Sequence, residues 1–210
     1  MSEPSPRGRF ITLEGIDGAG KSTHAAWLVE ALTARGRRVV ATREPGGTPT
    51  GEAIRGFLLH EAMTHETECL LMFAARREHV ARVIAPALAR GEVVLCDRFT
   101  DATFAYQGAG HGVSMTLIAQ LATLVHGDCN PDLTLLFDVP SAVSRERLDR
   151  IAARGRALDK FEREERAFFD RVRDCYLARA AAEPARFRVI DSTRPVVDVR
   201  AELTRIVEAL

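Results

Sequence analysis

Glycines, a lysine and a serine lie near the start of the chain at a spacing that suits phosphate binding. Residues Gly15 to Ser22 fill the pattern G-x-x-x-x-G-K-[ST], between an apolar run at Phe10–Leu13 and a helical pattern that begins near Lys21. In such a loop the backbone amides turn toward phosphate oxygens, the lysine supplies positive charge and the serine offers a hydroxyl to Mg²⁺. The alternatives are a coincidental glycine turn and nucleotide binding without catalysis. The residues expected at the nucleotide are Gly15, Ile16, Asp17, Gly18, Ala19, Gly20, Lys21, Ser22 and Thr23.

A carboxylate and several arginines lie where they could complete a phosphate site. Asp97 ends an apolar strand pattern, so Ser22 and Asp97 are the candidate magnesium residues, although an aspartate at a strand end is often only a loop cap. Arg76 follows the largely apolar stretch Leu70–Ala75, where a lone charge needs a partner, and this favours a phosphate group on a second substrate. Each arginine has the alternative of a solvated helix residue. The arginines at predicted loop edges are Arg43, Arg55, Arg76 and Arg98.

A second basic region runs from Arg145 to Lys160, with Gly155 between Arg154 and Arg156. It could form a lid that closes over the site and excludes water. It could equally form a solvated helix with internal ion pairs, and the sequence leaves both interpretations open.

The remaining pattern alternates strands with helices. The helix after the glycine loop should end near Arg35, because Gly36 suits a left-handed cap, and Pro86 should kink or break a long helix over 66–90. This order predicts a single-domain α/β fold, with a parallel sheet covered by helices on both faces and ligands at the carboxyl ends of the strands. A final helix should open at Pro195. The further predicted strands are 39–42, 93–97, 133–139 and 187–190.

The composition limits the possible partners and compartment. The chain has 210 residues, and its 29 basic and 29 acidic residues cancel, so we expect no nucleic-acid partner and no membrane association. Residues 1–9 are polar and should form a disordered lead-in, and no apolar run is long enough to span a membrane. The four cysteines have no zinc-like spacing, which predicts reduced thiols in a cytoplasmic protein.

Four segments together resemble the bacterial thymidylate kinase family. They are Phe10–Thr23, Thr42–Thr48 (Thr-Arg-Glu-Pro-Gly-Gly-Thr), Cys96–Gly108 and Asn130–Leu135, and the similarity runs from about Phe10 to the carboxyl terminus. The resemblance implies a P-loop NTPase fold with a five-stranded parallel sheet over residues 10–210 and a basic lid near 150–162. It also implies a cytoplasmic homodimer that uses ATP and Mg²⁺ to convert dTMP to dTDP, releasing ADP, for dTTP synthesis.

The resemblance also assigns roles to single residues. It places Asp17 at the deoxyribose 3′-hydroxyl, Arg76 and Arg98 on the dTMP phosphate, and Tyr106 in the space of a ribose 2′-hydroxyl. Met72 stands where many members have an aromatic that stacks on thymine, and a methionine can still pack against a flat base. Phe73 is adjacent but should point elsewhere on a helix, so which side chain covers the base stays open. The residues expected to line the dTMP pocket are Glu44, Arg55, Met72, Phe73, Arg76, Arg98, Thr103, Tyr106 and Gln107.

Gly18 stands where eukaryotic-type members carry an arginine, so catalytic charge is expected from the lid. Arg154, Arg156 and Lys160 are the candidates, and the lid register leaves the choice between Arg154 and Arg156 open. The full expected catalytic set is Lys21, Asp17, Arg98, Arg154 and Arg156.

Two other functions compete with this reading. A deoxynucleoside kinase would have an acceptor without a phosphate, and it would leave the arginines without an anion. A nucleotide-dependent regulatory module would need segments that sense the γ-phosphate, for which the sequence carries no recognisable signature. The sequence does not rank dTMP against dUMP, which differ by one methyl group.

Overall fold

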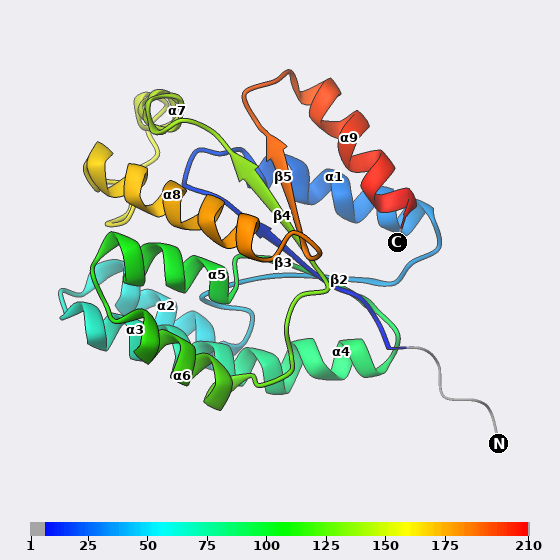
Figure 1. Cartoon of the computed structure of the whole chain (residues 1–210), viewed down its shortest axis with the longest axis horizontal. Coiled ribbons are helices and arrows are strands. Elements are labelled where there is room, and N and C mark those ends of the chain that lie inside the picture. The colour runs from blue at the N-terminus through cyan, green and yellow to red at the C-terminus, as the bar shows by residue number, and fades with distance from the viewer. Residues whose placement is uncertain (1–6, 210) are drawn as a thin grey trace.

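The computed structural model describes residues 7–209, which form a five-stranded sheet between layers of helices (Figure 1). All strand pairs are parallel, in the order β2-β3-β1-β4-β5. Ile11 of the central strand pairs with Leu95 on one side and with Leu133 on the other. The predicted fold class is therefore confirmed. The strands are β1 (Phe10–Glu14), β2 (Val39–Arg43), β3 (Val93–Asp97), β4 (Leu133–Asp138) and β5 (Phe187–Asp191).

Helices cover both faces of this sheet. In Figure 1, α1 and α9 lie together on one side, whereas α3, α4 and α6 form a group on the other. α7 lies near the arrowheads of the strands, which mark their carboxyl ends. The helices are α1 (Lys21–Ala34), α2 (Pro49–His60), α3 (His65–His79), α4 (Ala85–Ala89), α5 (Thr100–Thr103), α6 (Met115–Val125), α7 (Ser141–Ala153), α8 (Arg166–Ala182) and α9 (Val196–Glu208), with π-helical turns η1 (Val80–Ile84) and η2 (Phe104–Gly110).

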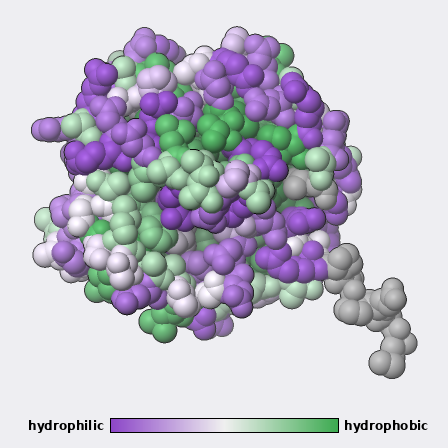
Figure 2. Space-filling view, in the orientation of Figure 1, coloured by the Kyte–Doolittle hydropathy of each residue, from purple (hydrophilic) through white to green (hydrophobic). Residues whose placement is uncertain are grey.

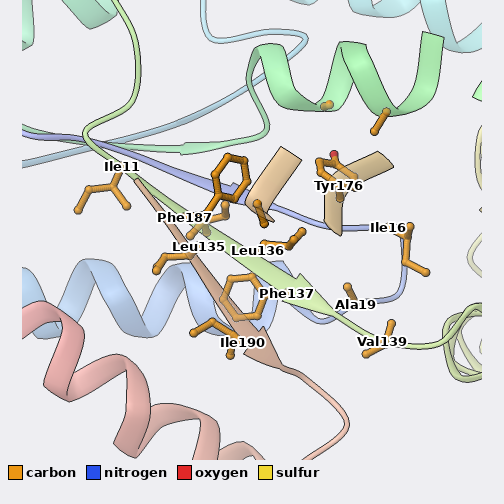
Figure 3. Close-up of a cluster of buried hydrophobic side chains, with 14 of the residues drawn as sticks. Ile11, Ile16, Ala19, Leu135, Leu136, Phe137, Val139, Tyr176, Phe187 and Ile190 are labelled. Atoms are coloured by element: carbon orange, nitrogen blue, oxygen red, sulfur yellow. The ribbon is translucent and has the colours of Figure 1, made fainter. Parts of the chain in front are cut away.

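The central strand is buried along its whole length, because the helical layers exclude water from both of its faces. Alternate side chains of β4 enter the two layers of the core. In Figure 3, Phe137 lies on one side of β4 beside Ile190, whereas Tyr176 reaches the other side from α8. This packing fixes the strand ends from which the loops of the site emerge.

The helix boundaries follow the expected signals. α1 ends at Ala34 and is followed by Gly36 with a positive φ of 76°. The predicted long helix over 66–90 breaks near Pro86: α3 ends at His79, a π-helical turn follows, and α4 begins at Ala85. Proline lacks an amide hydrogen, which explains why a regular helix does not continue through this position.

The expected disordered lead-in over residues 1–9 is not disordered at its inner end. Arg7 forms an ion pair with Asp132, and the amide of Gly8 donates to the carbonyl of Leu88 at 2.8 Å. Contacts with α4, with β3 and with the segment before β4 thus hold residues 7–9, and residues 1–6 lie outside the described part of the chain.

Within residues 7–209 the structure has no helix that is both long and apolar enough to cross a bilayer. In Figure 2 hydrophilic side chains cover much of the molecular face, and a band of hydrophobic side chains crosses its upper half.

Candidate active site

The glycine loop leaves the carboxyl end of β1, between the ends of β3 and β4. The connection that follows β1 leads toward the β2 edge of the sheet, whereas the connection that follows the neighbouring β4 leads toward β5, so the loops diverge here and leave a crevice. Open α/β sheets bind ligands at such a point. Two cavities lie in this region, and we name them the basic cavity and the aromatic cavity.

The basic cavity lies along the glycine loop. Its lining contains nine lysine and arginine side chains and five aspartate and glutamate side chains, so it suits a ligand with several negative charges. The lining residues are Asp17, Gly18, Gly20, Lys21, Ser22, Thr23, His24, Arg43, Glu44, Arg55, Asp97, Arg98, Arg147, Leu148, Arg150, Ile151, Arg154, Arg156, Asp159, Glu162, Ser192, Arg194 and Val196.

Core packing and hydrogen bonds from Lys21 fix the conformation of the glycine loop. Ile16 and Ala19 pack into the main apolar core, so these two expected nucleotide contacts can reach a ligand only through their backbone. The Nζ of Lys21 donates to the carbonyl oxygens of Gly15 and Ile16 at 2.9 and 3.1 Å. Burial and the charge of Arg98 lower the pKa of Lys21.

Gly18 has no room for a side chain. Its φ is 75°, and an added Cβ would lie 2.8 Å from the backbone oxygen of Ser144 in α7. An arginine could not replace it without moving α7, which agrees with the expectation that charge comes from elsewhere.

Asp97 contributes an unsatisfied carboxylate oxygen to the basic cavity. Its Oδ1 is buried without a hydrogen-bond partner, and Ser22 lines the same cavity. Within the described residues no group of three or more His, Cys, Asp or Glu side chains could hold a metal ion. Mg²⁺ at nucleotide sites typically takes one or two protein ligands and completes its shell with phosphates and water. The pair Ser22 and Asp97 therefore fits Mg²⁺ held together with a nucleotide.

The aromatic cavity lies beside the basic cavity, and both are lined by Asp17, Glu44, Arg55, Arg98 and Asp159. The two therefore form one continuous site. The aromatic cavity is lined by Asp17, Glu44, Pro45, Arg55, Leu59, Met72, Arg76, Arg98, Phe99, Ala102, Thr103, Tyr106, Gln107, Asp159 and Phe161.

Asp17 and Arg98 form an ion pair where the cavities meet. The Nη2 of Arg98 lies 2.5 Å from Oδ1 of Asp17, and the hydroxyl of Tyr106 donates to Oδ2 at 2.8 Å. Burial by itself raises the pKa of Asp17, but the charges of Arg98 and Lys21 outweigh it and leave the pKa below its ordinary value. Asp17 is therefore a carboxylate that can accept further hydrogen bonds at neutral pH.

Arg98 is the only non-glycine residue within 7–209 with a positive φ, at 69°. Glu14 supports this conformation: its Oε1 accepts from the amide of Phe99 at 2.7 Å, and its Oε2 accepts from the hydroxyl of Tyr176 at 2.7 Å. The hydroxyl of Tyr176 also accepts a hydrogen bond from Nη1 of Arg98 at 3.2 Å. A backbone strained at this position indicates that the direction of the guanidinium matters.

Arg76 has partners within the protein, so its charge does not by itself require a substrate phosphate. Its Nε donates to Oε2 of Glu44 at 2.7 Å, and Nη2 donates to Thr103 at 3.1 Å. Oε1 of Glu44 lies 2.9 Å from Nδ1 of His79. Burial raises the pKa of Glu44, but Arg76 and His79 outweigh it and lower the pKa. Nη1 of Arg76, in contrast, is buried without a partner.

The structure separates Met72 from Phe73. Met72 lines the aromatic cavity, whereas Phe73 packs into an apolar cluster with α6 and is 1% exposed. Phe73 therefore lies outside the pocket that it was expected to line, because neighbouring residues of α3 face different sides of the helix. Phe99 and Phe161 supply aromatic rings to the cavity, and neither was predicted from the sequence.

Residues 154–165 connect α7 to α8 and border both cavities, and we call them the lid segment. Arg154 and Arg156 line the basic cavity, and Nη2 of Arg156 lies 2.6 Å from Oε1 of Glu162. Lys160 lines neither cavity, because its Nζ donates to Oε2 of Glu68 at 2.6 Å. α7 ends at Ala153, so residues 154–160 of the predicted basic region are not helical.

Several residues of the basic cavity were not predicted. Arg147 donates to the carbonyls of Gly18 and Ser192 at 3.1 and 2.8 Å, and it joins the glycine loop to the segment after β5. The density of arginines in α7 was visible in the sequence, but it did not show which of them faces the loop. Ser192, Arg194 and Val196 extend the cavity, and no sequence motif marks them.

Comparisons with known proteins agree with this geometry. The model of the thymidylate kinase family matches residues 13–203. Thymidylate kinase of Bordetella petrii is 60% identical over 204 residues, which are 97% of each chain, and that of Bordetella pertussis is 61% identical over 206 residues, which are 98% of this chain and 97% of the other. The structure of thymidylate kinase from Ehrlichia chaffeensis superimposes with a TM-score of 0.77 at 37% identity, over 97% of this chain and 99% of the other. The predicted family is confirmed: the chain belongs to the thymidylate kinase family.

Proposed function

We propose that this protein is a dTMP kinase, which transfers the γ-phosphoryl group of ATP to dTMP and yields dTDP and ADP. The observation that carries this proposal is the junction of the two cavities. A polyanion site on a glycine loop opens, at Asp17 and Arg98, into a second cavity whose lining combines arginines with apolar and amide side chains, a combination that suits a nucleoside monophosphate.

The basic cavity holds the phosphate donor. The glycine loop, Lys21 and the amino end of α1 bind the β- and γ-phosphates of ATP, whose negative charge matches the lining. Ser22 and Asp97 hold Mg²⁺, which when bound neutralises charge on the phosphate oxygens. The nucleoside part extends toward the segment at Ser192 and Val196.

The aromatic cavity holds dTMP. Arg55 and Arg98 line both cavities, so we assign the dTMP phosphate to them, where it faces the γ-phosphate. Arg76 lies in the aromatic cavity alone, and this revises its expected role as a phosphate ligand. Its free Nη1 is a donor that suits a carbonyl oxygen of thymine, whereas the amino group of cytosine would face it unpaired. Met72 and Phe99 supply apolar surface for the base.

Catalysis comes from positioning and charge. An oxygen of the dTMP phosphate attacks the γ-phosphorus in line, and the bond from that phosphorus to the oxygen of the departing ADP breaks. Arg98 fixes the attacking group, and the carboxylate of Asp17 accepts the 3′-hydroxyl of the sugar. Arg154 or Arg156 neutralises charge on the transferring group, and Phe161 of the lid segment helps exclude water.

A direct assay tests this function. The pure protein is incubated with MgATP and a panel of dTMP, dUMP, dCMP and thymidine, and ADP release is followed. We expect strong stimulation by dTMP and little by thymidine, since thymidine leaves Arg55 and Arg98 without an anion. The variant Lys21→Met controls for a contaminating kinase. Stimulation by thymidine but not by dTMP would overturn the proposal in favour of a deoxynucleoside kinase.

We also propose a homodimer formed by α2, α3 and α6. These helices contact one another in the order α2, α3, α6, and each exposes an apolar side chain: Phe57 is 59%, Leu70 52% and Leu124 79% exposed. A second copy would cover this face. Light scattering should give twice the chain mass, and Leu124→Arg should shift it to the mass of one chain. A single-chain mass for the unmodified protein would exclude the dimer.

We place the protein in the cytoplasm. Its four cysteines are free thiols, which a reducing compartment preserves. Detection of the protein in the soluble fraction of lysed cells and not in a periplasmic extract would support this location, and the reverse result would exclude it.

A further inference from the structure

Glu68 of α3 is a buried carboxylate that binds groups from two distant segments. Its side chain is 4% exposed. Oε1 accepts from Nε2 of Gln107 at 2.9 Å, and Oε2 accepts from Nζ of Lys160 at 2.6 Å. Nε2 of His111 lies 3.8 Å from Oε1. A carboxylate this deeply buried requires hydrogen-bond partners, and these two bonds supply them.

The first bond orients a side chain of the aromatic cavity. Gln107 lies in the π-helical turn η2, is buried, and lines the cavity. An ionised carboxylate only accepts hydrogen bonds, so Gln107 must turn its amide nitrogen toward Glu68. Its amide oxygen is then the atom left to meet a ligand. Glu68 thereby selects which of the two ends of the amide the ligand encounters.

The second bond holds the lid segment. Lys160 is flanked by Asp159 and Phe161, and both neighbours line the aromatic cavity. The ring of Phe161 meets Tyr106 edge to face, with centroids 6.3 Å apart, and Nζ of Lys160 lies 4.9 Å from the centroid of Phe161. An ion pair at Lys160 therefore places Phe161 on the cavity wall.

We propose that Glu68 is a positioning residue that couples closure of the lid segment to the orientation of Gln107 in the acceptor pocket. The inference rests on the proposed function for the identity of the acceptor, dTMP. One carboxylate serves both partners, so the lid segment and the pocket share a single anchor. Loss of its charge releases the lid segment and at the same time weakens the constraint on Gln107.

Two conservative variants separate the two bonds. Glu68→Gln keeps the size of the side chain and an acceptor for Gln107, but it removes the charge that holds Lys160. Lys160→Met removes only the lid contact and changes a side chain that is 31% exposed, so it should fold normally. Glu208→Gln, in the exposed ion pair with Arg35, is the matched control. Thermal unfolding of each variant checks that it is folded.

The first measurement is independent of catalysis. Limited trypsin digestion with mass spectrometry gives the cleavage rate after Arg154 and Arg156. We expect both variants to be cut about tenfold faster than the parent, because a charge-assisted hydrogen bond that restrains the lid segment is lost. The control should be cut at the parental rate. A parental rate in Glu68→Gln and Lys160→Met would overturn the proposal, whatever the enzyme phosphorylates.

The second measurement is the coupling between the two residues. Calorimetry should show about tenfold weaker dTMP binding in each single variant, with ATP binding retained. The double variant should be no weaker than either single variant, because both changes remove the same anchor. Additive losses would mean that Glu68 and Lys160 act separately and would refute the coupling. Failure of dTMP to bind the parent protein would instead count against the proposed function, and the digestion result would still decide the lid anchor.

Discussion

The guanidinium of Arg98 lies against the carboxylate of Asp17 in the glycine loop, with Nη2 and Oδ1 2.5 Å apart. This contact joins the loop that is expected to bind ATP to the strand end that is expected to bind dTMP. Because the hydroxyl of Tyr106 hydrogen-bonds to both side chains, the three groups form one connected network between the two cavities. The pair therefore defines the point at which phosphoryl transfer would occur.

Glu14, which accepts hydrogen bonds from Phe99 and Tyr176 beside Arg98, should make the free energy of unfolding depend on pH. Burial and the neighbouring charge of Asp101 raise the pKa of Glu14 from 4.5 to about 8. A raised folded-state pKa means that its contribution to stability is complete below pH 4.5 and is lost as the pH rises toward 8. Glu14→Gln, which resembles the protonated form, should abolish this part of the decline in the free energy of unfolding. Urea unfolding at several values of pH, with Glu208→Gln as control, measures it; parallel curves for parent and variant would contradict the prediction.

Arg76→Lys tests the proposed contact with the base. Lysine retains a positive charge for Glu44 but loses the planar fork that presents Nη1. We expect the KM for dTMP to rise about tenfold or more, corresponding to about 1.5 to 3 kcal/mol, while the KM for ATP changes little. Preference for dTMP over dCMP should also fall. Arg76→Ala is a poorer test, because it strands Glu44 in the core. Equal losses for ATP and dTMP would argue against a role at the base.

The two lid arginines should differ in importance. Arg156 is paired with Glu162, and this ion pair offsets part of its charge. Arg154→Met should therefore lower kcat more than Arg156→Met, by about 10³-fold or more if Arg154 stabilises the transferring group. Arg163→Met, an exposed arginine of the lid segment that lines neither cavity, is the control. Steady-state rates at saturating substrates distinguish the variants, and a larger effect at Arg156 would reverse the assignment.

Asp97→Asn should weaken the use of Mg²⁺. The unpartnered Oδ1 would lose its charge, and substitutions near metal sites typically cost about 10- to 100-fold in metal affinity. The Mg²⁺ concentration for half-maximal ADP release should rise by about this factor, and Ser22→Ala should shift it in the same direction. Asp191→Asn on β5, outside both cavities, should leave the curve unchanged. An unchanged curve for Asp97→Asn would remove this residue from the metal site.

The sequence by itself determined the elements and the order in which they occur. Short apolar runs, glycine caps and Pro86 act through local backbone geometry, so the five strands and the break in the long helix were predictable. The glycine loop was equally clear, because each residue in it has a local reason: a tight turn, an amide, a charge or a hydroxyl. The segments around Glu44 and Asp97 then carried the prediction of the family.

Only the tertiary structure decided which side chains meet. Arg76 finds Glu44 from another element, Arg98 closes on Asp17, and Lys160 turns from the phosphate region to Glu68. Each of these partners is separated by many residues in the chain, so no local pattern records the pair. The pairing also sets protonation: neighbouring cations outweigh burial and lower the pKa of Asp17 and Glu44, whereas burial and Asp101 together raise the pKa of Glu14. The sequence therefore supplied the groups for the chemistry, and the packing of distant elements decided their directions and partners.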